Sequence, residues 1–572
     1  MIEEPLPSDA PIPAPAGWAS RRTFLAGALA AAGAALLDPR QLAFARAQAA
    51  ALPVGELFPL GVASGDPDPS SVILWTRLIA PGGGDPLPGT DVAVDWEVAS
   101  DEAFTSIVAS GTAPAVAALA HSVHVEAGGL QPDTWYWYRF SVDGRTSPQG
   151  RTRTFPGAGV TPDQVRFGVA TCQNWSDGYY TAYAGMAVED LDFVVFVGDY
   201  IYERSKQSGP RPITLPESVD LPTYRGRYEL YKSDANLQAA HHAFPWIVTM
   251  DDHEVANDTV GDAGKEGAGA GDPAAIAAFR LRRADAFQAW YEHQPLRLNA
   301  PDSPDYQLHR TVPHSDLVRF YVLDGRQYRS LYPGGVGTGP DSPERHAESQ
   351  TMLGLDQEAW LRGQFAATDC RWNIIAQQTV FTATPLAIGS AVVYNLDQWD
   401  GYVAARNRLL QDLVDQEVRN PIILSGDIHL AGAAAVRLDY DDPAAPDIAY
   451  EIVATSISSG FGDDLLPIFE SAVPKIGWLS YANARKRGYA VCTVTAESFT
   501  TDFRVVASTL TPTSTVSTDH TDVVANRAPV IDPIDEPTTT SSSTTTTAPS
   551  TPTDPAVAPG AVPVDGVASY TG

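Results

Sequence analysis

The amino-acid sequence predicts an α/β layered domain preceded by a smaller all-β domain. From Gln164 onward, short and wholly apolar runs alternate with segments of helical character, which is typical of strands buried on both faces of a sheet. The preceding segment, Pro59–Phe155, holds Val-, Trp-, Tyr- and Thr-rich stretches between Gly, Pro and Asp turns, a pattern typical of an all-β domain. We therefore expect the all-β domain at residues 55–156 and the layered domain at residues 160–508.

Apolar runs and helical patterns give the elements of the layered domain. The predicted strands are Val165–Ala170, Phe193–Val197, Trp246–Met250, Leu317–Leu323, Asn373–Ala376 and Ile422–Leu424. The first predicted helix has Asp272 as its cap and Pro273 at its first position, where a missing N–H costs nothing. Two further helices are predicted over Glu358–Phe365 and Gly401–Val418. This alternation of strands and helices favours a layered α/β architecture.

Three segments predict the strands of the all-β domain: Ser71–Leu78, Asp91–Val98 and Trp135–Val142. The last of them follows the sequence LQPDT at residues 130–134. This order, with a Leu-x-Pro-x-Thr turn before an aromatic strand, resembles the fibronectin type III or immunoglobulin-like sandwich. The aromatic side chains are most simply core residues, so we expect no chemistry from this domain.

Net charge and cysteine content limit the classes of function. Asp and Glu total 69 residues against 38 for Lys and Arg, which gives a formal net charge of −31. Such a surface should repel nucleic acid and anionic membranes unless a local cationic site, such as bound metal ions, overrides it. We therefore expect no nucleic-acid-binding surface. The cysteines Cys172, Cys370 and Cys492 are too few for a disulfide scaffold, and their odd number leaves at least one thiol unpaired.

The N-terminal residues 1–49 predict a twin-arginine signal peptide. Paired arginines at 21–22 precede Phe24 and an Ala/Leu/Gly run that ends at Leu37 and is too short to span a bilayer. Small residues at 45–49 offer cleavage sites. We expect a secreted protein that the twin-arginine export machinery carries in folded form, with no transmembrane segment in the mature chain. An amphipathic or anchoring N-terminal segment is the alternative interpretation.

Residues 509–572 are predicted to form a disordered tail. Within them, Thr538–Thr553 is a Thr/Ser/Pro low-complexity stretch, and the sequence that follows is rich in Pro, Ala, Val and Gly. Neither part has the aromatic content needed to bury a core. One interpretation is a wall-spanning or O-glycosylated spacer that associates the protein with the cell wall. A dispensable tail is the other interpretation.

Metal-binding side chains follow four of the predicted strands. These side chains are Cys172, Asp199 with Tyr202, Asp252 with His253, and Asp427 with His429. Any one of them alone has a structural explanation, such as a small buried cysteine or a histidine that only hydrogen-bonds. Four such strand ends in one domain indicate a shared edge, which is where open α/β sheets build their sites. We therefore predict a metal site at this edge.

The donor types suit two different cations. Thiolate, phenolate, imidazole and carboxylate suit a redox-range transition metal, and phenolate suits ferric iron in particular. The oxygen donors of Asp199, Asp252, Asn257 and Asp427 suit a hard divalent ion such as calcium, magnesium or manganese. Asp199 has two oxygens and could bridge both ions. Two cations about 3.5–4 Å apart can hold a phosphoryl group and ionise the attacking water.

Nine motifs in a fixed order resemble one family. They are ATCQNW (170–175), VGDYIYE (197–203), DDHEVAND (251–258), YEHQPLR (291–297), LDGRQYR (323–329), QWDGY (398–402), SGDIHLAG (425–432), RGYAV (487–491) and DFRVV (502–506). Over Pro59–Val506 the chain resembles the PhoD-type alkaline phosphatases and phosphodiesterases, which are related to purple acid phosphatases. The resemblance implies a metallophosphatase core, in which two sheets pack face to face and helices flank them. It also implies a site that holds Fe³⁺ and Ca²⁺.

The same resemblance implies ligands for each cation. The iron ligands would be Cys172, Asp199, Tyr202 and His429, and calcium would take Asp199 as bridge with Asp252, Asp427 and Asn257. Mn²⁺ or Mg²⁺ is the alternative at the second position. An Asp at position 427, where purple acid phosphatases have His, is consistent with a harder second ion.

The resemblance also suggests residues that act on the substrate. His253 and the bridging Asp199 would be catalytic, and Glu254 would support the ligands from behind. Arg204, Arg326 and Arg329 could contact the substrate phosphate, although a surface or structural role explains each arginine equally well.

The implied activity is hydrolysis of phosphate monoesters and diesters by a metal-activated water outside the cytoplasm. No serine nucleophile is required, and the sequence offers no convincing Ser/His/Asp arrangement. One alternative is a phospholipase D-like phosphodiesterase that acts on lipid or teichoic acid substrates. The other alternative is a surface binding protein whose phosphatase domain is inactive.

Overall fold

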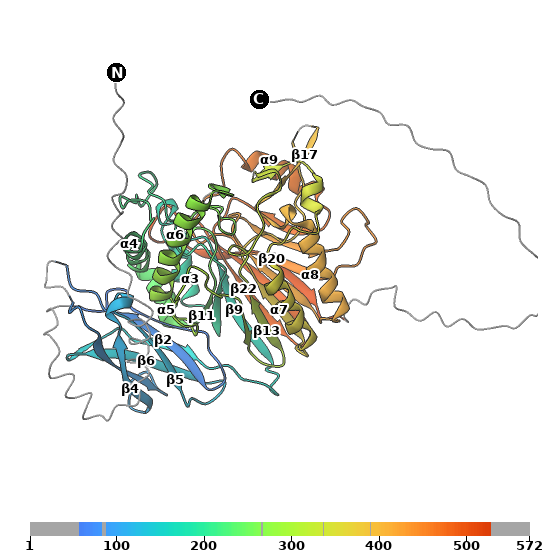
Figure 1. The fold of residues 1–572 in the computed structure, drawn as a ribbon. Helices are drawn as coiled ribbons and strands as arrows, with labels where there is room; N and C mark the ends of the chain where they lie inside the picture. The colour runs from blue at the N-terminus through green and yellow to red at the C-terminus, as the bar shows by residue number, and fades with distance from the viewer. Residues whose placement is uncertain (1–55, 83–86, 265–266, 336, 389, 528–572) are drawn as a thin grey trace, which may run out of the picture. The chain divides into compact units, whose positions relative to one another are not determined.

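The computed structural model describes residues 56–82, 87–264, 267–335, 337–388 and 390–527. Two large sheets pack face to face in the middle of the described fold, and helices cover their outer faces (Figure 1). The predicted signal peptide and the low-complexity stretch lie outside the described residues. In the described part of the chain, no helix combines the length and apolar character that crossing a membrane requires.

The first sheet has nine strands, and its centre is parallel. In spatial order they are β24 (Val516–Ala525), β23 (Ser498–Val506), β22 (Gly488–Thr495), β9 (Gln164–Ala170), β10 (Phe193–Phe196), β11 (Pro245–Val248), β1 (Val62–Gly65), β2 (Ser71–Arg77) and β5 (Ser122–Gly128). Strands β9, β10 and β11 run parallel, so their carboxyl ends meet at one edge. The predicted strands at these three positions are confirmed to within three residues at each end.

The second sheet has seven strands, four of which are parallel. In spatial order they are β12 (Arg310–Pro313), β13 (Val318–Val322), β15 (Trp372–Ala376), β18 (Pro421–Ser425), β20 (Ala449–Val453), β19 (Ala431–Val436) and β21 (Leu479–Asn483). The parallel members are β13, β15, β18 and β20. Strands β13, β15 and β18 were predicted, whereas β19 to β21 were not.

A continuous apolar core joins the two sheets. Phe167 and Phe193 of the first sheet stack at 5.2 Å between ring centroids, and Phe320 of the second sheet packs edge-on against both. All three side chains are fully buried, and Trp372 closes the same cluster. This packing explains why the strand sequences are apolar on both faces: one face meets the other sheet and the other face meets helices.

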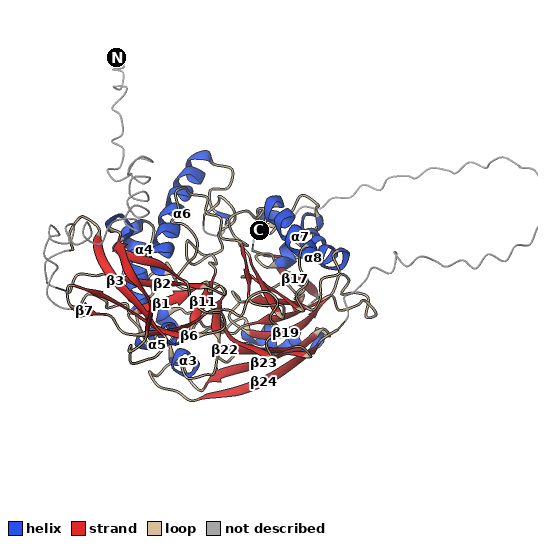
Figure 2. Cartoon of the chain, turned by 90° about the horizontal axis from the view of Figure 1, so that it is seen from below, coloured by secondary structure: helices blue, strands red, loops and turns tan. Residues whose placement is uncertain are grey.

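Helices cover the outer face of each sheet (Figure 2). The first sheet is covered by α3 (Thr181–Met186), α4 (Leu221–Lys232), α5 (Ala235–Ala243) and α6 (Pro273–His293), and the second by α7 (Leu355–Ala366) and α8 (Val403–Asp415). Helix α6 begins as predicted, because the Asp272 side chain accepts the N–H of Ala274 and Pro273 follows it. A short helix, α9 (Leu466–Ala472), contacts β16 (Leu386–Ile388), which pairs with β17 (Ala391–Asn395), and β17 also pairs with β14 (Thr338–Gly339).

The N-terminal segment is an all-β sandwich, as predicted, but it is not separate from the main sheet. Its outer layer contains β4 (Ile107–Ala115), β3 (Val92–Ala99), β6 (Trp135–Val142), β7 (Arg145–Thr146) and β8 (Gly150–Arg153). Its other layer is β1, β2 and β5, and β1 pairs in parallel with β11 of the large sheet. A core that includes Leu74, Tyr138 and Phe140 fills the space between the layers. The closer likeness to a fibronectin type III or immunoglobulin-like fold remains a prediction.

The predicted start of the tail at residue 509 is too early. Strand β24 pairs antiparallel with β23 along nearly its whole length and forms the edge of the nine-stranded sheet. Its side chains are exposed or half-buried throughout, so the sequence carries no apolar pattern there. Backbone hydrogen bonds to β23, which do not depend on side-chain type, hold the strand, and Val516, Val524 and His520 add packing contacts.

Candidate metal centre

The predicted metal-binding residues come together at the carboxyl ends of the parallel strands. They follow β9 (Cys172), β10 (Asp199 and Tyr202), β11 (Asp252 and His253) and β18 (Asp427 and His429). Both sheets therefore contribute, and they meet at the edge where ligands of layered α/β proteins bind.

Four of these residues have an unusual backbone conformation. Cys172, Asp199, Asp427 and His429 have φ values of 53°, 61°, 63° and 60°, in the left-handed region that side chains other than Gly rarely adopt. Such strain of about 1–3 kcal/mol per residue persists where the surrounding structure fixes it, which is most often at functional sites. The conformation turns each side chain sharply off the end of its strand, so that donors from different strands face one another.

The first group of donors matches the predicted iron ligands. One donor atom each of Cys172, Asp199 and His429 lie within 4.8 Å of one another. The Tyr202 hydroxyl donates to Asp199 Oδ2 at 2.8 Å and lies 2.9 Å from His429 Nε2. The carbonyl of Gly460 accepts from His429 Nδ1 at 3.0 Å, which leaves the Nε2 lone pair directed toward the cluster. The four side chains therefore converge on one point.

The second group is rich in carboxylates and shares Asp199 with the first. Asp199, Asp252 and His253 have donor atoms within 4.8 Å of one another, as do Asp251, Asp252 and Asp427. Asp199 thus lies between the two groups, as expected for a bridging ligand. Sequence analysis did not single out Asp251, although it stands beside Asp252 in the same motif.

Unpaired buried oxygens indicate that the cluster fits cations. Asp199 Oδ1, Asp251 Oδ2 and Asp252 Oδ1 are buried and have no hydrogen-bond partner in the described structure, although Arg326 Nη2 lies 3.5 Å from Asp252 Oδ1. Burial raises the pKa of the Asp199 carboxyl well above its usual range, and Asp252 adds to this rise although His253 opposes it. Burial likewise raises the pKa of the Cys172 thiol. A bound cation would satisfy these oxygens and hold thiol and carboxyl groups in their ionised forms.

Two buried glutamates fix the groups around the cluster. Glu254 accepts hydrogen bonds from the backbone N–H groups of Asp199 (3.1 Å), Tyr200 (2.6 Å) and Asp251 (2.9 Å), so it ties together the turns after β10 and β11. This placement agrees with its predicted supporting position. Glu203 pairs with His253 Nδ1 at 2.6 Å. Although burial alone would lower it, the Glu203, Asp199 and Asp252 carboxylates raise the pKa of His253 well above its usual range.

The structure gives Arg326 contacts that match the structural role, which the sequence left open beside a phosphate contact. Its guanidinium is buried and bonds Asp251 through Nε, both oxygens of Asp397 through Nη1 (2.9 and 3.0 Å) and Asp427 through Nη2 (2.9 Å). Arg329 is also buried and also pairs with Asp397. Both arginines bond Asp397 behind the cluster, and both side chains are buried, so neither guanidinium lies at an open surface. Sequence could not show this, because Asp397 comes from a distant segment.

The other two predicted residues, Asn257 and Arg204, lie beside the cluster and contact Glu203. Asn257 donates its backbone N–H to Glu203 Oε1 at 3.1 Å, and its side chain is half-buried. The side chain of Arg204 is 42% exposed and its Nε lies 3.3 Å from Glu203 Oε1. Sequence analysis also missed Ser459, whose hydroxyl donates to the Tyr202 hydroxyl at 2.7 Å. Ser459 lies in a loop without any recognisable motif.

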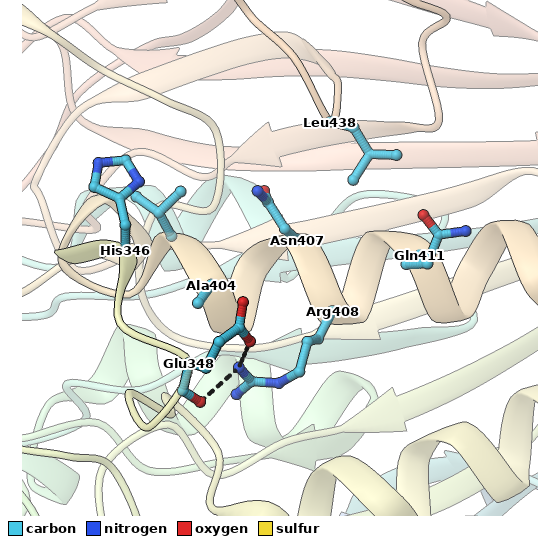
Figure 3. Close-up of a pocket in the computed structure, with 8 residues that line it drawn as sticks. His346, Glu348, Ala404, Asn407, Arg408, Gln411 and Leu438 are labelled. Atoms are coloured by element: carbon cyan, nitrogen blue, oxygen red, sulfur yellow. Dashed lines mark hydrogen bonds and ion pairs between the residues drawn. The ribbon is translucent and has the colours of Figure 1, made fainter. Parts of the chain in front are cut away.

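A surface pocket of about 300 Å³ lies elsewhere, along α8 (Figure 3). Its lining includes His346, Asn407 and Gln411, and Arg408 pairs across it with Glu348. None of the predicted metal-binding or catalytic residues lines it. The candidate site is therefore at the strand ends and not in this pocket.

Comparison with known proteins agrees with this geometry. Residues 167–503 match the PhoD-like phosphatase family, and residues 44–156 match the N-terminal domain of the same family. The chain belongs to the PhoD-like phosphatase family. It is 42% identical to alkaline phosphatase D of Bacillus subtilis (strain 168) over 470 residues, which are 81% of this chain and 79% of that protein. A solved structure titled "Structure of PhoD" superposes with a TM-score of 0.77 at 39% identity, covering 85% of this chain and 95% of the other.

Membership in the PhoD-like family establishes the class of reaction. The chain is a phosphoric ester hydrolase, and its substrates are phosphate esters. The family is one of metallophosphatases, and the grouped Cys, Asp and His side chains at the strand ends are the groups able to bind metal. The predicted alternative of an inactive surface binding protein is therefore set aside.

Proposed function

We propose that this PhoD-like protein is a secreted phosphohydrolase that cleaves phosphate monoesters and diesters at a centre of Fe³⁺ and Ca²⁺. The supporting observation is the division of donors around Asp199. On one side Cys172, Tyr202 and His429 offer sulfur, phenol and imidazole, and on the other side only carboxylates and His253 are present. The mixed donor set suits a redox-range transition metal, and its phenol favours ferric iron in particular, whereas oxygen donors favour calcium, with Mn²⁺ or Mg²⁺ as alternatives.

When bound, the cations would lower the pKa of water and neutralise charge on the phosphoryl oxygens. The protein residues fix where the two cations would lie. Asp199 belongs to both groups of donors, and Glu254 fixes the backbone of Asp199 by accepting its N–H. Asp252, Asp427 and Asn257 would complete the calcium position.

His253 is suited to handle the proton of the leaving group. Its Nδ1 is held by Glu203, which orients the ring and keeps the imidazole protonated. Its ring lies 4.0 Å from the Tyr202 ring, beside the cluster, so Nε2 is the atom that would donate to the departing oxygen. Arg204, half-exposed next to Glu203, would contact the substrate from the solvent side.

Apolar residues next to the centre support one further candidate, a phospholipase D-like activity on lipid or teichoic acid diesters. Ile428 stands between Asp427 and His429. It packs half-buried against a small apolar cluster around Leu430, as do Phe461, Leu466 and Phe469. Such side chains could hold the apolar alcohol of a lipid diester. The chemistry at phosphorus would be the same in both cases.

We further propose the chain organisation that the sequence suggests. A twin-arginine signal peptide at 1–49 would export the folded, metal-loaded enzyme, and the all-β domain at 55–156 would precede the catalytic domain at 160–508. The Thr/Ser/Pro-rich stretch would act as a spacer toward the cell wall.

Rates on a panel of esters test this function. The purified enzyme should hydrolyse an aryl phosphate monoester and a bis-aryl diester, and chelation of its metals should abolish both activities. A lipid diester cleaved much faster than either would favour the phospholipase D-like candidate. Absence of hydrolysis on every ester by metal-loaded protein would contradict the proposal.

A further inference from the structure

Because Arg326 bonds carboxylates of the protein, a further positively charged side chain, besides Arg204 and the proposed metal ions, could bind the substrate phosphate. Arg326 and Arg329 are buried, and both pair with carboxylates of the protein. The chain as a whole carries a formal charge of −31, so an incoming phosphate needs a local positive group at the entrance. We propose that Arg487 binds the substrate phosphate and favours the dianionic monoester over the monoanionic diester. This inference rests on the proposed function.

Hydrogen bonds tie the Arg487 backbone to the loop that supports Tyr202. Gly488, the next residue, donates its N–H to the Ser456 carbonyl at 2.9 Å, and Thr455 Oγ1 donates to the Lys486 carbonyl at 2.7 Å. Three residues further along that loop, Ser459 Oγ donates to the Tyr202 hydroxyl. The start of β22 therefore lies beside the predicted iron position.

The charge of Arg487 also acts on the pKa values of groups at the centre. Burial lowers the pKa of Arg487, while the nearby Asp177, Cys172 and Tyr202 raise it. Arg487 in turn contributes to the lowered pKa of His429. The guanidinium contacts the Ala484 carbonyl, and Ala484 belongs to the same apolar cluster as Leu430, the residue that follows His429, so the side chain lies near His429.

The charge of Arg487 is not paired within the described structure. Its Nη1 donates to the carbonyls of Ala484 (3.1 Å) and Lys486 (2.9 Å), but Nε and Nη2 have no partner among the described residues, and no carboxylate there forms an ion pair with it. Its two basic neighbours are different. Arg485 pairs with Glu470, and Lys486 pairs with Asp519. Arg487 is thus the member of this basic triplet whose donors are open to a ligand.

Phosphate charge explains the expected selectivity. An arginine fork can donate two parallel hydrogen bonds to phosphate oxygens, and such charge-assisted bonds are among the strong ones. A monoester dianion has three terminal oxygens and two charges, whereas a diester has two terminal oxygens and one charge. Removing Arg487 should therefore weaken monoester binding more than diester binding.

The test compares Arg487→Gln with Arg485→Gln in the full-length, metal-loaded enzyme. For 4-nitrophenyl phosphate we expect Arg487→Gln to lower kcat/KM by about 10- to 100-fold, mainly through KM, as loss of a hydrogen bond to a charged group implies. For bis(4-nitrophenyl) phosphate the loss should stay below about threefold, and inhibition by inorganic phosphate should weaken in parallel with the monoester. Arg485→Gln should change none of these values, and Arg487→Lys should restore part of the monoester rate.

The possible outcomes separate two kinds of failure. Equal losses on both esters, an unchanged inhibition constant for phosphate, or loss of bound metal in Arg487→Gln would overturn the role of Arg487. A wild-type enzyme without activity on either ester would instead overturn the proposed function itself.

Discussion

The hydroxyl of Tyr202 lies 2.9 Å from Nε2 of His429, although the two residues are 227 positions apart in the chain. Tyr202 follows β10 of the nine-stranded sheet and His429 follows β18 of the seven-stranded sheet. Their contact therefore depends on the face-to-face packing of the two sheets. This relationship links the fold to the chemistry, because neither sheet alone could assemble the donors.

The bridging position of Asp199 gives the first prediction. Asp199→Asn should lower activity by at least about 1,000-fold, because it weakens both cation positions that would stabilise charge at phosphorus. The side-chain volume is nearly unchanged, so the melting temperature of the metal-free protein should not fall. Initial rates and thermal melts measure both effects. Asp463→Asn, at an exposed site, is the matched control. Activity that survives Asp199→Asn would count against the bridge.

Tyr202 gives the second prediction. A phenolate bound to ferric iron absorbs visible light, so the purified enzyme should be coloured and Tyr202→Phe should lose the band. The variant keeps the ring that contacts His253 at 4.0 Å, which makes misfolding a poor explanation for bleaching. Absorption spectra recorded at matched iron content test this. An unchanged band in Tyr202→Phe would remove the residue from the ligands.

Arg326 gives the third prediction. Arg326→Met should destabilise the metal-free protein by about 3–5 kcal/mol, because the buried Asp251 and Asp397 and the half-buried Asp427 then lose their shared counter-ion. Denaturant unfolding after chelation measures the loss. Arg362→Met removes a pair with Asp412 from a side chain that is 51% exposed, and it should cost less than about 1 kcal/mol. Similar values for the two variants would contradict the structural role of Arg326.

The buried His314 gives the fourth prediction, which concerns pH. Burial lowers the pKa of His314 to about 3, and its ring packs against Phe155 and Phe193. In the unfolded chain its pKa is near 6.5, so the unfolded state binds more protons as pH falls below that value. The stabilising contribution is complete above pH 6.5 and should decline by about 1.4 kcal/mol per pH unit toward pH 3.

The matched variant for this effect is His314→Gln. Its free energy of unfolding should fall less steeply between pH 6 and pH 4 than that of the wild type. The two slopes should differ by about 1.4 kcal/mol per pH unit, which corresponds to the uptake of one proton. Unfolding at several pH values in the metal-free protein provides the comparison. Identical slopes would show that His314 is accessible to protonation in the folded state.

The strands of the catalytic sheets were largely predictable from sequence. The run Phe193–Val197 is apolar because one face meets the second sheet and the other meets the helices, and β10 occupies Phe193–Phe196. Strand β24 was not predictable, because as an edge strand it is held by backbone bonds and keeps polar side chains. The pairing of β1 with β11 was also not predictable, since the pairing of two strands far apart in the chain leaves no local pattern in the sequence.

The donors of the centre were predictable because each directly follows a strand end. Cys172, Asp199 and Asp427 stand where apolar runs stop, and their residue types are those of metal ligands. The supporting groups were less predictable. Ser459 and Arg326 act through contacts with residues far away in the chain, and no spacing rule relates such positions.

The central claim is that separate strand ends hold two cations of different kinds around Asp199. Elemental analysis of the purified full-length enzyme, combined with its rate on a phosphate monoester before and after metal removal, tests this most directly. We expect about one iron and about one hard divalent cation per chain. Activity should be lost on chelation and regained only when both metals are added back. Full activity in protein that contains neither iron nor a divalent cation would contradict it.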